Sequence, residues 1–320
     1  MNTTFIHGLE GFPVAKPGSA VATIGTFDGI HRGHQEIFDR VKGHARESGL
    51  DPVLITFHPH PRTVVSPDRV PMLLTTIEEK KNFVPCFFDG IVLVLDFNRA
   101  LMNMSAEEFV RTVLVDTVGV KKLIVGYDHT LGKNREGTPE HLESLGGDHG
   151  FEVEVVSPVI DGGEPISSSR IRKRMTAGDF STSLDLLGHA YAICGTVERG
   201  IGLGRKIGYP TANVRYNNRK LLPPQGVYSC YVQVNQVNHP GMMFIGQNHF
   251  NPETGITVEA NIFDLNEDLY DQEIMVYPTH FIRYNQKYEN VDLLIEQLEL
   301  DKKEVIRLLN KGEADHVNRH

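Results

Sequence analysis

The sequence has no tryptophan and only three cysteines among its 320 residues. Because Cys86, Cys194 and Cys230 are far apart in the chain, they predict free thiols in a reducing compartment rather than a disulfide framework. The sequence also lacks a basic start followed by an apolar segment, and it has no hydrophobic run long enough to cross a membrane. We therefore expect a cytoplasmic protein without a membrane partner.

An excess of positive charge is missing as well. The chain has 32 Lys and Arg against 41 Asp and Glu, for a net charge of −9. This balance excludes a general basic field that would attract nucleic acid, so an anionic ligand has to be held locally by arginines, backbone amides and metal. No apolar stripe or heptad repeat indicates a fixed assembly, so an oligomer is possible but unsupported. Small molecules are the expected partners.

The first half of the sequence alternates short β-branched runs with amphipathic stretches. Such alternation predicts an α/β fold with a doubly wound parallel sheet covered by helices. Ser105 with Glu108 three residues later is a capping-box pattern for one of these helices. The strands are expected at 20–24, 53–57, 91–95, 122–126 and 153–156, and helices at 76–83 and 105–117.

The pattern changes near residue 186, as expected for a chain of this length, which favours two domains. Short alternating runs with Gly, Pro and Asn turns then predict a small antiparallel β-barrel. Two C-terminal helices are expected, one after Asn290 and one capped by Asp301 with Glu304 at its third position. The predicted domains are 1–186 and 187–320, with barrel strands at 191–197, 227–234, 257–263 and 273–276.

The stretch from Gly25 to His34, GTFDGIHRGH, joins the first predicted strand to an amphipathic helix. Its glycines allow close backbone approach to a ligand, and a helix start offers N–H groups to phosphate. His31 and His34 could instead be ordinary surface or core residues, or a metal pair, but no further metal ligand stands nearby at suitable spacing. A nucleotide site is favoured, formed by Gly25, Thr26, Phe27, His31, Gly33 and His34.

Two more stretches point to phosphate. Ser167, Ser168 and Ser169 enter a predicted helix, where they could simply cap it; with Arg172 they would also form a triphosphate cradle. The glycine-rich run from Gly195 to Gly208 would be weak on its own, but it leads into the sequence GYPTAN, which ends at Asn213.

Together, GTFDGIHRGH, ISSSRIR and GYPTAN resemble the signatures of the prokaryotic bifunctional riboflavin kinase/FMN adenylyltransferase (FAD synthetase) family. The resemblance implies a nucleotidyltransferase domain followed by a kinase barrel. It implies that ATP phosphorylates riboflavin to FMN and then adenylylates FMN to FAD with release of pyrophosphate. Mg²⁺ is the implied cofactor, and ATP, riboflavin and FMN are the implied substrates.

The resemblance also assigns roles to individual residues. His31 and His34 would bind the reacting phosphate, and Glu259 would be the catalytic carboxylate of the kinase. Thr211 and Asn213 would hold Mg²⁺ and ATP phosphate, which suits their oxygen donors. The remaining assignments are Gly204 and Arg205 for the nucleotide, and Phe57, Pro59, Asp128, Tyr270 and Arg283 for the flavin.

Several positions depart from the family pattern. Thr130-Leu131 replace Arg-Phe, and Phe244, Asp271 and Asn285 replace Asn, Gly and Glu. These changes leave two alternatives open: a monofunctional FAD synthetase with a degenerate barrel, or a flavin-binding regulator without catalysis. The phosphate-handling residues are retained, which favours the bifunctional enzyme.

Overall fold

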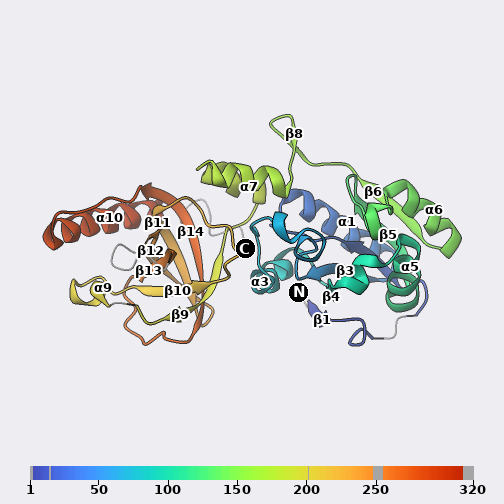
Figure 1. Ribbon diagram of the computed structural model, residues 1–320, viewed down its shortest axis with the longest axis horizontal. Helices are drawn as coiled ribbons and strands as arrows, with labels where there is room; N and C mark the ends of the chain where they lie inside the picture. The colour runs from blue at the N-terminus through green and yellow to red at the C-terminus, as the bar shows by residue number, and fades with distance from the viewer. Residues whose placement is uncertain (1–2, 14–15, 201, 248–254, 313–320) are drawn as a thin grey trace. The chain divides into compact units, whose positions relative to one another are not determined.

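The computed structural model describes residues 3–13, 16–200, 202–247 and 255–312, which form two compact units (Figure 1). The first unit contains residues 1–71 and 80–168, and the second contains 72–79 and 169–320. The short segment 72–79 therefore belongs by its contacts to the second unit, although the chain then returns to the first. The predicted boundary after residue 186 stays a prediction.

The first unit is built on a six-stranded sheet in which every neighbouring pair is parallel. The strand order β1-β4-β3-β2-β5-β6 confirms the predicted doubly wound sheet and adds an edge strand, β1, that the sequence pattern did not indicate. The strands are β1 (Thr4–His7), β2 (Ala20–Ile24), β3 (Asp51–His58), β4 (Ile91–Asp96), β5 (Val120–Gly126) and β6 (Glu152–Val156).

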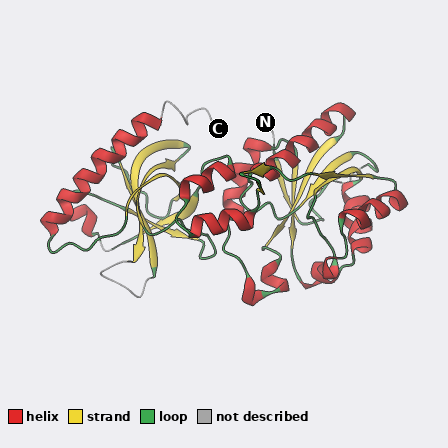
Figure 2. Ribbon diagram, turned by 90° about the horizontal axis from the view of Figure 1, so that it is seen from above, coloured by secondary structure: helices red, strands yellow, loops and turns green. Residues whose placement is uncertain are grey.

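Helices lie on both sides of this sheet (Figure 2). The predicted capping box is confirmed, since Ser105 and Glu108 bond each other's backbone N–H groups. The helix that starts there is a single α-turn, because the chain continues from Val110 as a π-helix, Val110–Val118. This single-turn helix is α5 (Ala106–Phe109), and the other α-helices of this unit are α1 (Arg32–Ser48), α2 (Arg62–Val65), α3 (Ile77–Phe87, which begins in the second unit), α4 (Arg99–Asn103) and α6 (Pro139–His149).

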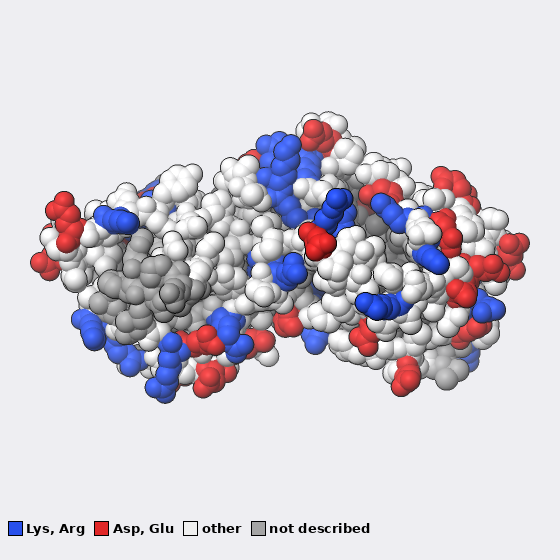
Figure 3. Space-filling view, in the orientation of Figure 1, with Lys and Arg blue, Asp and Glu red and all other residues white. Residues whose placement is uncertain are grey.

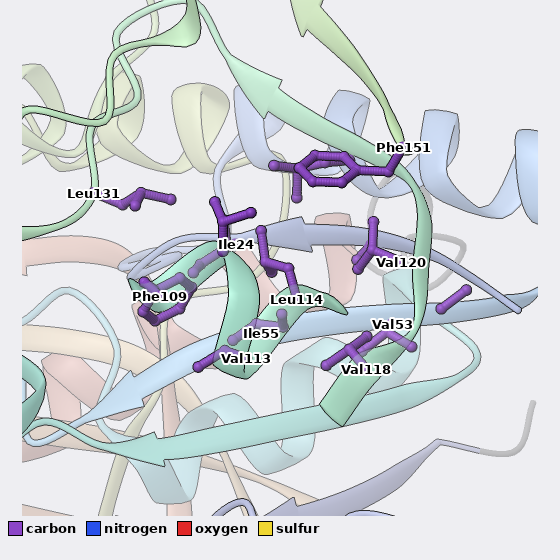
Figure 4. Packing of buried hydrophobic residues seen from close by; sticks show 14 of the residues in the cluster. Ile24, Val53, Ile55, Phe109, Val113, Leu114, Val118, Val120, Leu131 and Phe151 are labelled. Carbon is purple, nitrogen blue, oxygen red and sulfur yellow. The ribbon is translucent and has the colours of Figure 1, made fainter. Parts of the chain in front are cut away.

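The core of the first unit lies between the sheet and the π-helix (Figure 4). Ile24 and Ile55 project from neighbouring strands toward Val113 and Leu114 of the π-helix, and all four are nearly inaccessible to water. Helix α1 is amphipathic, as the sequence predicted, and it buries an apolar stripe formed by Ile37, Phe38, Val41 and Ala45. Burial on both faces explains why the strands read as unbroken apolar runs.

The second unit is a closed antiparallel barrel, as predicted, with the order β10-β13-β12-β11-β14-β9. Two of its strands, β10 and β12, were not expected. In β12, Pro240 and Gly241 interrupt the alternation of apolar and polar residues. The strands are β9 (Ile193–Glu198), β10 (Ala212–Tyr216), β11 (Gly226–Val234), β12 (Val237–Gln247), β13 (Ile256–Ile262) and β14 (Glu273–Arg283).

A single long helix, α10 (Val291–Gly312), packs on this barrel, so the expectation of two C-terminal helices was wrong. Asp301 does not cap a second helix. Its carboxylate is 2% exposed in the middle of α10, where it accepts hydrogen bonds from Arg283 and Gln297. Val305 and Leu309 anchor the helix on Met242 and Phe263. The remaining elements are a small hairpin, β7 (Ile160–Asp161) and β8 (Glu164–Pro165), with α7 (Ser168–Thr176), α8 (Phe180–Leu187) and α9 (Leu203–Lys206).

Candidate active sites

Three predicted segments of the first unit meet at one edge of the sheet. The GTFDG turn follows β2, Pro59 follows β3, and Asp128 follows β5. These strands are parallel neighbours in the order β3-β2-β5, so their carboxyl ends lie side by side. The chain direction across the sheet reverses at β2, and ligands of open α/β sheets bind outside such a point.

The two histidines lie at the start of α1. His31 is the N-cap residue, and His34 is in the first helical turn. Their rings are stacked, with centroids 3.6 Å apart and planes at 21°. Gly33 leaves room for this arrangement, since a Cβ there would lie 3.2 Å from the His31 ring. The sequence therefore predicted correctly that both rings share one helix N-terminus, a position suited to an anion.

Burial lowers the pKa of His34 well below its usual value, and positive charge on His31 and on Lys80 lowers it further. His34 is therefore neutral at pH 7, and its buried Nδ1 has no hydrogen-bond partner among the described residues. The Phe27 ring packs edge-on against His34 at 5.3 Å between centroids. Phe27 is 3% exposed, so its side chain supports the histidine from the core side.

Two side chains hold the carbonyls of the GTFDG turn. Lys80 Nζ donates a hydrogen bond to the Thr26 carbonyl at 2.5 Å, and Ser168 Oγ donates to the Asp28 carbonyl at 2.8 Å. Ser168 thus connects the two phosphate motifs that the sequence indicated. Lys80 was not predicted, because nothing in its local sequence distinguishes it from Lys81 beside it.

Ser169 and Arg172 belong to the second unit. Ser169 is exposed, and Arg172 Nε donates to the Met72 carbonyl at 2.8 Å. Blue side chains gather over α7, whose sequence SSRIRKRMT holds three arginines and a lysine (Figure 3). This is a local concentration of positive charge on an acidic protein.

In the barrel, Glu259 lies on β13 between two strand neighbours, Asn213 of β10 and Phe244 of β12. Its carboxylate accepts hydrogen bonds from Thr211 at 3.2 Å and from Thr257 at 3.5 Å. The structure therefore brings Thr211, Asn213 and Glu259 together. Thr257 was not predicted, and its position two residues before Glu259, on the same face of the strand, was the available signal.

Burial raises the pKa of Glu259, and the hydrogen bonds from Thr211 and Thr257 partly oppose that rise. A cavity opens beside Thr211, and Arg205, Thr211 and Tyr270 are among the residues that line it. The Arg199 guanidinium lies 4.9 Å from the centre of the Tyr270 ring. The cavity therefore combines an aromatic ring with one basic and two acidic side chains, Arg205, Glu267 and Asp268, and it reaches the half-buried Glu259 only through Thr211.

Gly200 has a steric reason to be glycine, since a Cβ there would overlap the amide of Asn213. Gly204 begins a tight turn in which its carbonyl accepts the Tyr209 N–H at 2.8 Å. The glycine-rich stretch therefore runs close against the GYPTAN segment. Both glycines keep the backbone near Asn213 and Thr211.

Arg283 is the one predicted flavin residue with a strong internal partner. Its guanidinium donates to Asp301 at 2.7–3.0 Å and to the Tyr284 carbonyl at 3.1 Å. It therefore fixes α10 to the end of β14, and its contact with flavin stays a prediction. Phe57 packs edge-on against Phe97 at 5.5 Å, while Pro59 and Asp128 are exposed.

The departures from the family pattern have clear positions. Asp271 has a φ of 62°, the left-handed conformation that favours glycine. Asn285 Nδ2 donates to the Ile245 carbonyl at 3.1 Å, and Thr130 accepts from Arg135 at 3.0 Å. Leu131 is buried in the core of the first unit. Thr130 and Asn285 are thus held by hydrogen bonds and Leu131 by packing, whereas Asp271 keeps a backbone conformation that is unfavourable for a residue with a side chain.

Among the described residues, no three His, Cys, Asp or Glu side chains cluster closely enough to hold a metal ion. No helix in the described part of the chain has the length and apolarity to cross a membrane.

Comparison with known proteins matches two successive regions of the chain. Residues 14–170 match the family model described as FAD synthetase, and residues 187–309 match the one described as riboflavin kinase. The bifunctional riboflavin kinase/FMN adenylyltransferase of Bacillus subtilis (strain 168) is 35% identical over 294 residues, which cover 90% of this chain and 92% of the relative. The chain belongs to the bifunctional riboflavin kinase/FMN adenylyltransferase family.

Two further proteins align with almost the whole chain. The bifunctional riboflavin kinase/FMN adenylyltransferase of Escherichia coli (strain K12) is 33% identical over 297 residues, covering 92% of this chain and 95% of the relative. A crystal structure described as a macrolide-efflux protein from Streptococcus pneumoniae aligns with a TM-score of 0.81 and 32% identity, covering 95% of this chain and 98% of that one. The similarity to these two proteins therefore extends over both regions that match the family models.

Proposed function

We propose that this family member carries out its two reactions at two separate sites, one in each unit. Riboflavin is phosphorylated to FMN in the barrel, and FMN is adenylylated to FAD at the histidine pair. The observation that carries the proposal is the grouping of residues. His31, His34 and Ser168 belong to one cluster, whereas Thr211, Asn213 and Glu259 belong to another.

In the kinase reaction, the riboflavin 5′-hydroxyl attacks the γ-phosphorus of ATP, and ADP leaves. Glu259 accepts the proton of that hydroxyl, for which its carboxylate has to be ionised. Thr211 and Asn213 would hold Mg²⁺, since Thr211 bonds Glu259, Asn213 is its neighbour on the adjacent strand, and hydroxyl and amide oxygens are the hard ligands that this ion prefers. The ion, when bound, neutralises phosphate charge. Gly204 and Arg205 contact the nucleotide, and Tyr270 contacts the flavin.

In the adenylyl transfer, a phosphate oxygen of FMN attacks the α-phosphorus of ATP, and pyrophosphate leaves. Phosphoryl-type transfers depend mainly on positioning and charge stabilisation. His31 and His34 hydrogen-bond the α-phosphate at the α1 N-terminus, while Gly25, Thr26, Phe27 and Gly33 shape the turn around the nucleotide. Ser167, Ser168, Ser169 and Arg172 are the proposed ligands of the leaving phosphates, and Phe57, Pro59 and Asp128 those of the flavin.

These reactions also define the partners, the domains and the location that we propose for the protein. The partners are small molecules, namely ATP, riboflavin and FMN, and the two catalytic domains are residues 1–186 and 187–320. Three free cysteines support a reducing compartment, and we assign the protein to the cytoplasm.

The experiment is a product time course with riboflavin and Mg-ATP, in which chromatography separates FMN from FAD. We expect FMN to accumulate first and FAD to follow. FAD formed only from supplied FMN would mean that the barrel is not a kinase. No product from either flavin would leave a flavin-binding protein and contradict the proposal.

A further inference from the structure

We propose that Lys80 is a positioning residue of the adenylyl-transfer site: its buried ammonium holds the turn between Gly25 and Gly29 in shape and places a positive charge next to the histidine pair. The inference rests on the proposed reaction at His31 and His34. It adds a residue that the sequence motifs do not contain.

The first argument is the position of the lysine. Lys80 lies on α3 and is 8% exposed, and its Nζ bonds the Thr26 carbonyl. The Thr56 hydroxyl donates to the same carbonyl at 3.3 Å. Burying an ammonium group is unfavourable unless the group is hydrogen-bonded. A buried lysine that bonds a single carbonyl is therefore an unfavourable way to hold a loop, which points to a further role for its charge.

The second argument is the conformation of the turn. Phe27 and Ile30 have φ values of 44° and 43°, which residues with side chains adopt at a cost. Both are buried, so the turn cannot relax toward solvent. Lys80 on the Thr26 carbonyl and Ser168 on the Asp28 carbonyl restrain the turn on either side of Phe27. The turn that leads into the histidine pair is therefore held at two carbonyls, one on each side of Phe27.

The third argument is charge. Burial lowers the pKa of Lys80 to about 8, and the negative charge of Asp28 opposes that shift. Lys80 and His31 in turn lower the pKa of His34. Among the described residues, the charged groups that shift these two pKa values are thus Asp28 for Lys80, and His31 and Lys80 for His34. An ammonium within electrostatic reach of His34 favours the negative charge that develops during adenylyl transfer.

The test compares Lys80→Met with Lys81→Met in the full-length protein. Lys81 is the adjacent residue on α3 and is exposed, so it is a matched control. In Lys80→Met we expect kcat for FAD formation from supplied FMN to fall roughly 100-fold, the loss typical of removing one preorganised charge or donor, with KM for ATP within about threefold. Riboflavin phosphorylation by the same protein should be unchanged, as should both reactions of Lys81→Met.

A second variant and a second measurement separate positioning from folding. Lys80→Gln keeps a neutral donor, and we expect a similar loss of kcat because the charge is gone. The imidazole titration of His34, followed by NMR, should move to higher pH in both Lys80 variants. Unchanged kcat in either variant, an unmoved titration, or equal losses in both reactions would overturn the inference. Absence of FAD from the wild-type protein would instead contradict the proposed function, and the titration would remain informative.

Discussion

The Glu79 carboxylate and the Lys220 ammonium lie 2.7 Å apart, and the two side chains are 0% and 1% exposed. Lys220 also donates to the Leu74 carbonyl at 2.6 Å, and Glu79 accepts the Cys194 N–H at 3.0 Å. The ammonium lies 3.8 Å from the centre of the Tyr191 ring. Burial raises the pKa of Glu79, and the charge of Lys220 opposes that rise. The segment 72–79 is thus attached to the barrel by a fully bonded ion pair.

Removing one member of this pair should destabilise the second unit strongly. In Glu79→Gln, the Lys220 ammonium stays buried without its counter-charge, a loss of about 3–5 kcal/mol in the free energy of unfolding. The double variant Glu79→Leu with Lys220→Met should recover most of that loss. Urea unfolding, monitored by the loss of kinase activity, measures the free energy of unfolding of the single and the double variant. Glu296→Gln, at an exposed position, is the control. A change below about 1 kcal/mol in Glu79→Gln would contradict this expectation.

Mutations at the two sites should separate the reactions. His31→Ala is expected to lower FAD formation by about 10²–10³-fold and leave riboflavin phosphorylation intact. Glu259→Gln is expected to lower phosphorylation by about 10²–10⁴-fold and leave FAD formation from supplied FMN intact. Chromatographic assays of each reaction decide the matter. A single substitution that abolishes both would contradict the two-site arrangement.

The pH dependence of the kinase should respond to Thr257. Its hydrogen bond favours the ionised form of Glu259, so Thr257→Val raises the pKa of that carboxyl further. Because the base has to be ionised, activity is lost as the pH falls through this pKa. The acidic limb of kcat/KM for phosphorylation should therefore shift to higher pH, with the alkaline side unchanged. FAD formation by the same variant is the control, and a limb that stays in place or shifts to lower pH would count against Glu259 as the base.

A methyl group at Gly200 should disturb the nucleotide-binding segment of the barrel. In Gly200→Ala, the added Cβ collides with the Asn213 amide, and we expect KM for ATP in the kinase reaction to rise at least about tenfold, which corresponds to about 1.4 kcal/mol. Gly43→Ala in α1 adds the same group where nothing lies within 4 Å and should be silent in both reactions. Unchanged kinase kinetics in Gly200→Ala would show that Asn213 does not act in ATP binding.

The parts of the fold that could be predicted are those that local pattern controls. Strands such as Ala20–Ile24 are continuous apolar runs, and the stripe from Ile37 to Ala45 repeats at helical spacing, so both were found. Asp301 was misassigned because Asp301 and Glu304 imitate a capping box, and only the distant Arg283 shows that the carboxylate is an ion-pair partner within one helix. A π-helix after Val110 leaves no comparable pattern.

The same limit applies to the sites. His31 and Glu259 could be predicted as site residues because each stands in a contiguous motif, and their roles stay predictions. Lys80 bonds a carbonyl 54 residues earlier in the chain, and Lys220 bonds Glu79, which lies 141 residues earlier. No local sequence pattern indicates such partners, because only the folded chain brings them together.

The attachment of residues 72–79 to the barrel has a consequence for the order in which the chain folds during synthesis. At ordinary translation rates of about 5–20 residues per second, Lys220 is made on the order of ten seconds after Glu79. During this interval, Lys80 can already bind the Thr26 carbonyl, while its neighbour Glu79 remains a solvated anion. Residues 72–79, which belong to the second unit, are therefore synthesised before the rest of that unit, and the barrel forms around a segment that is already there.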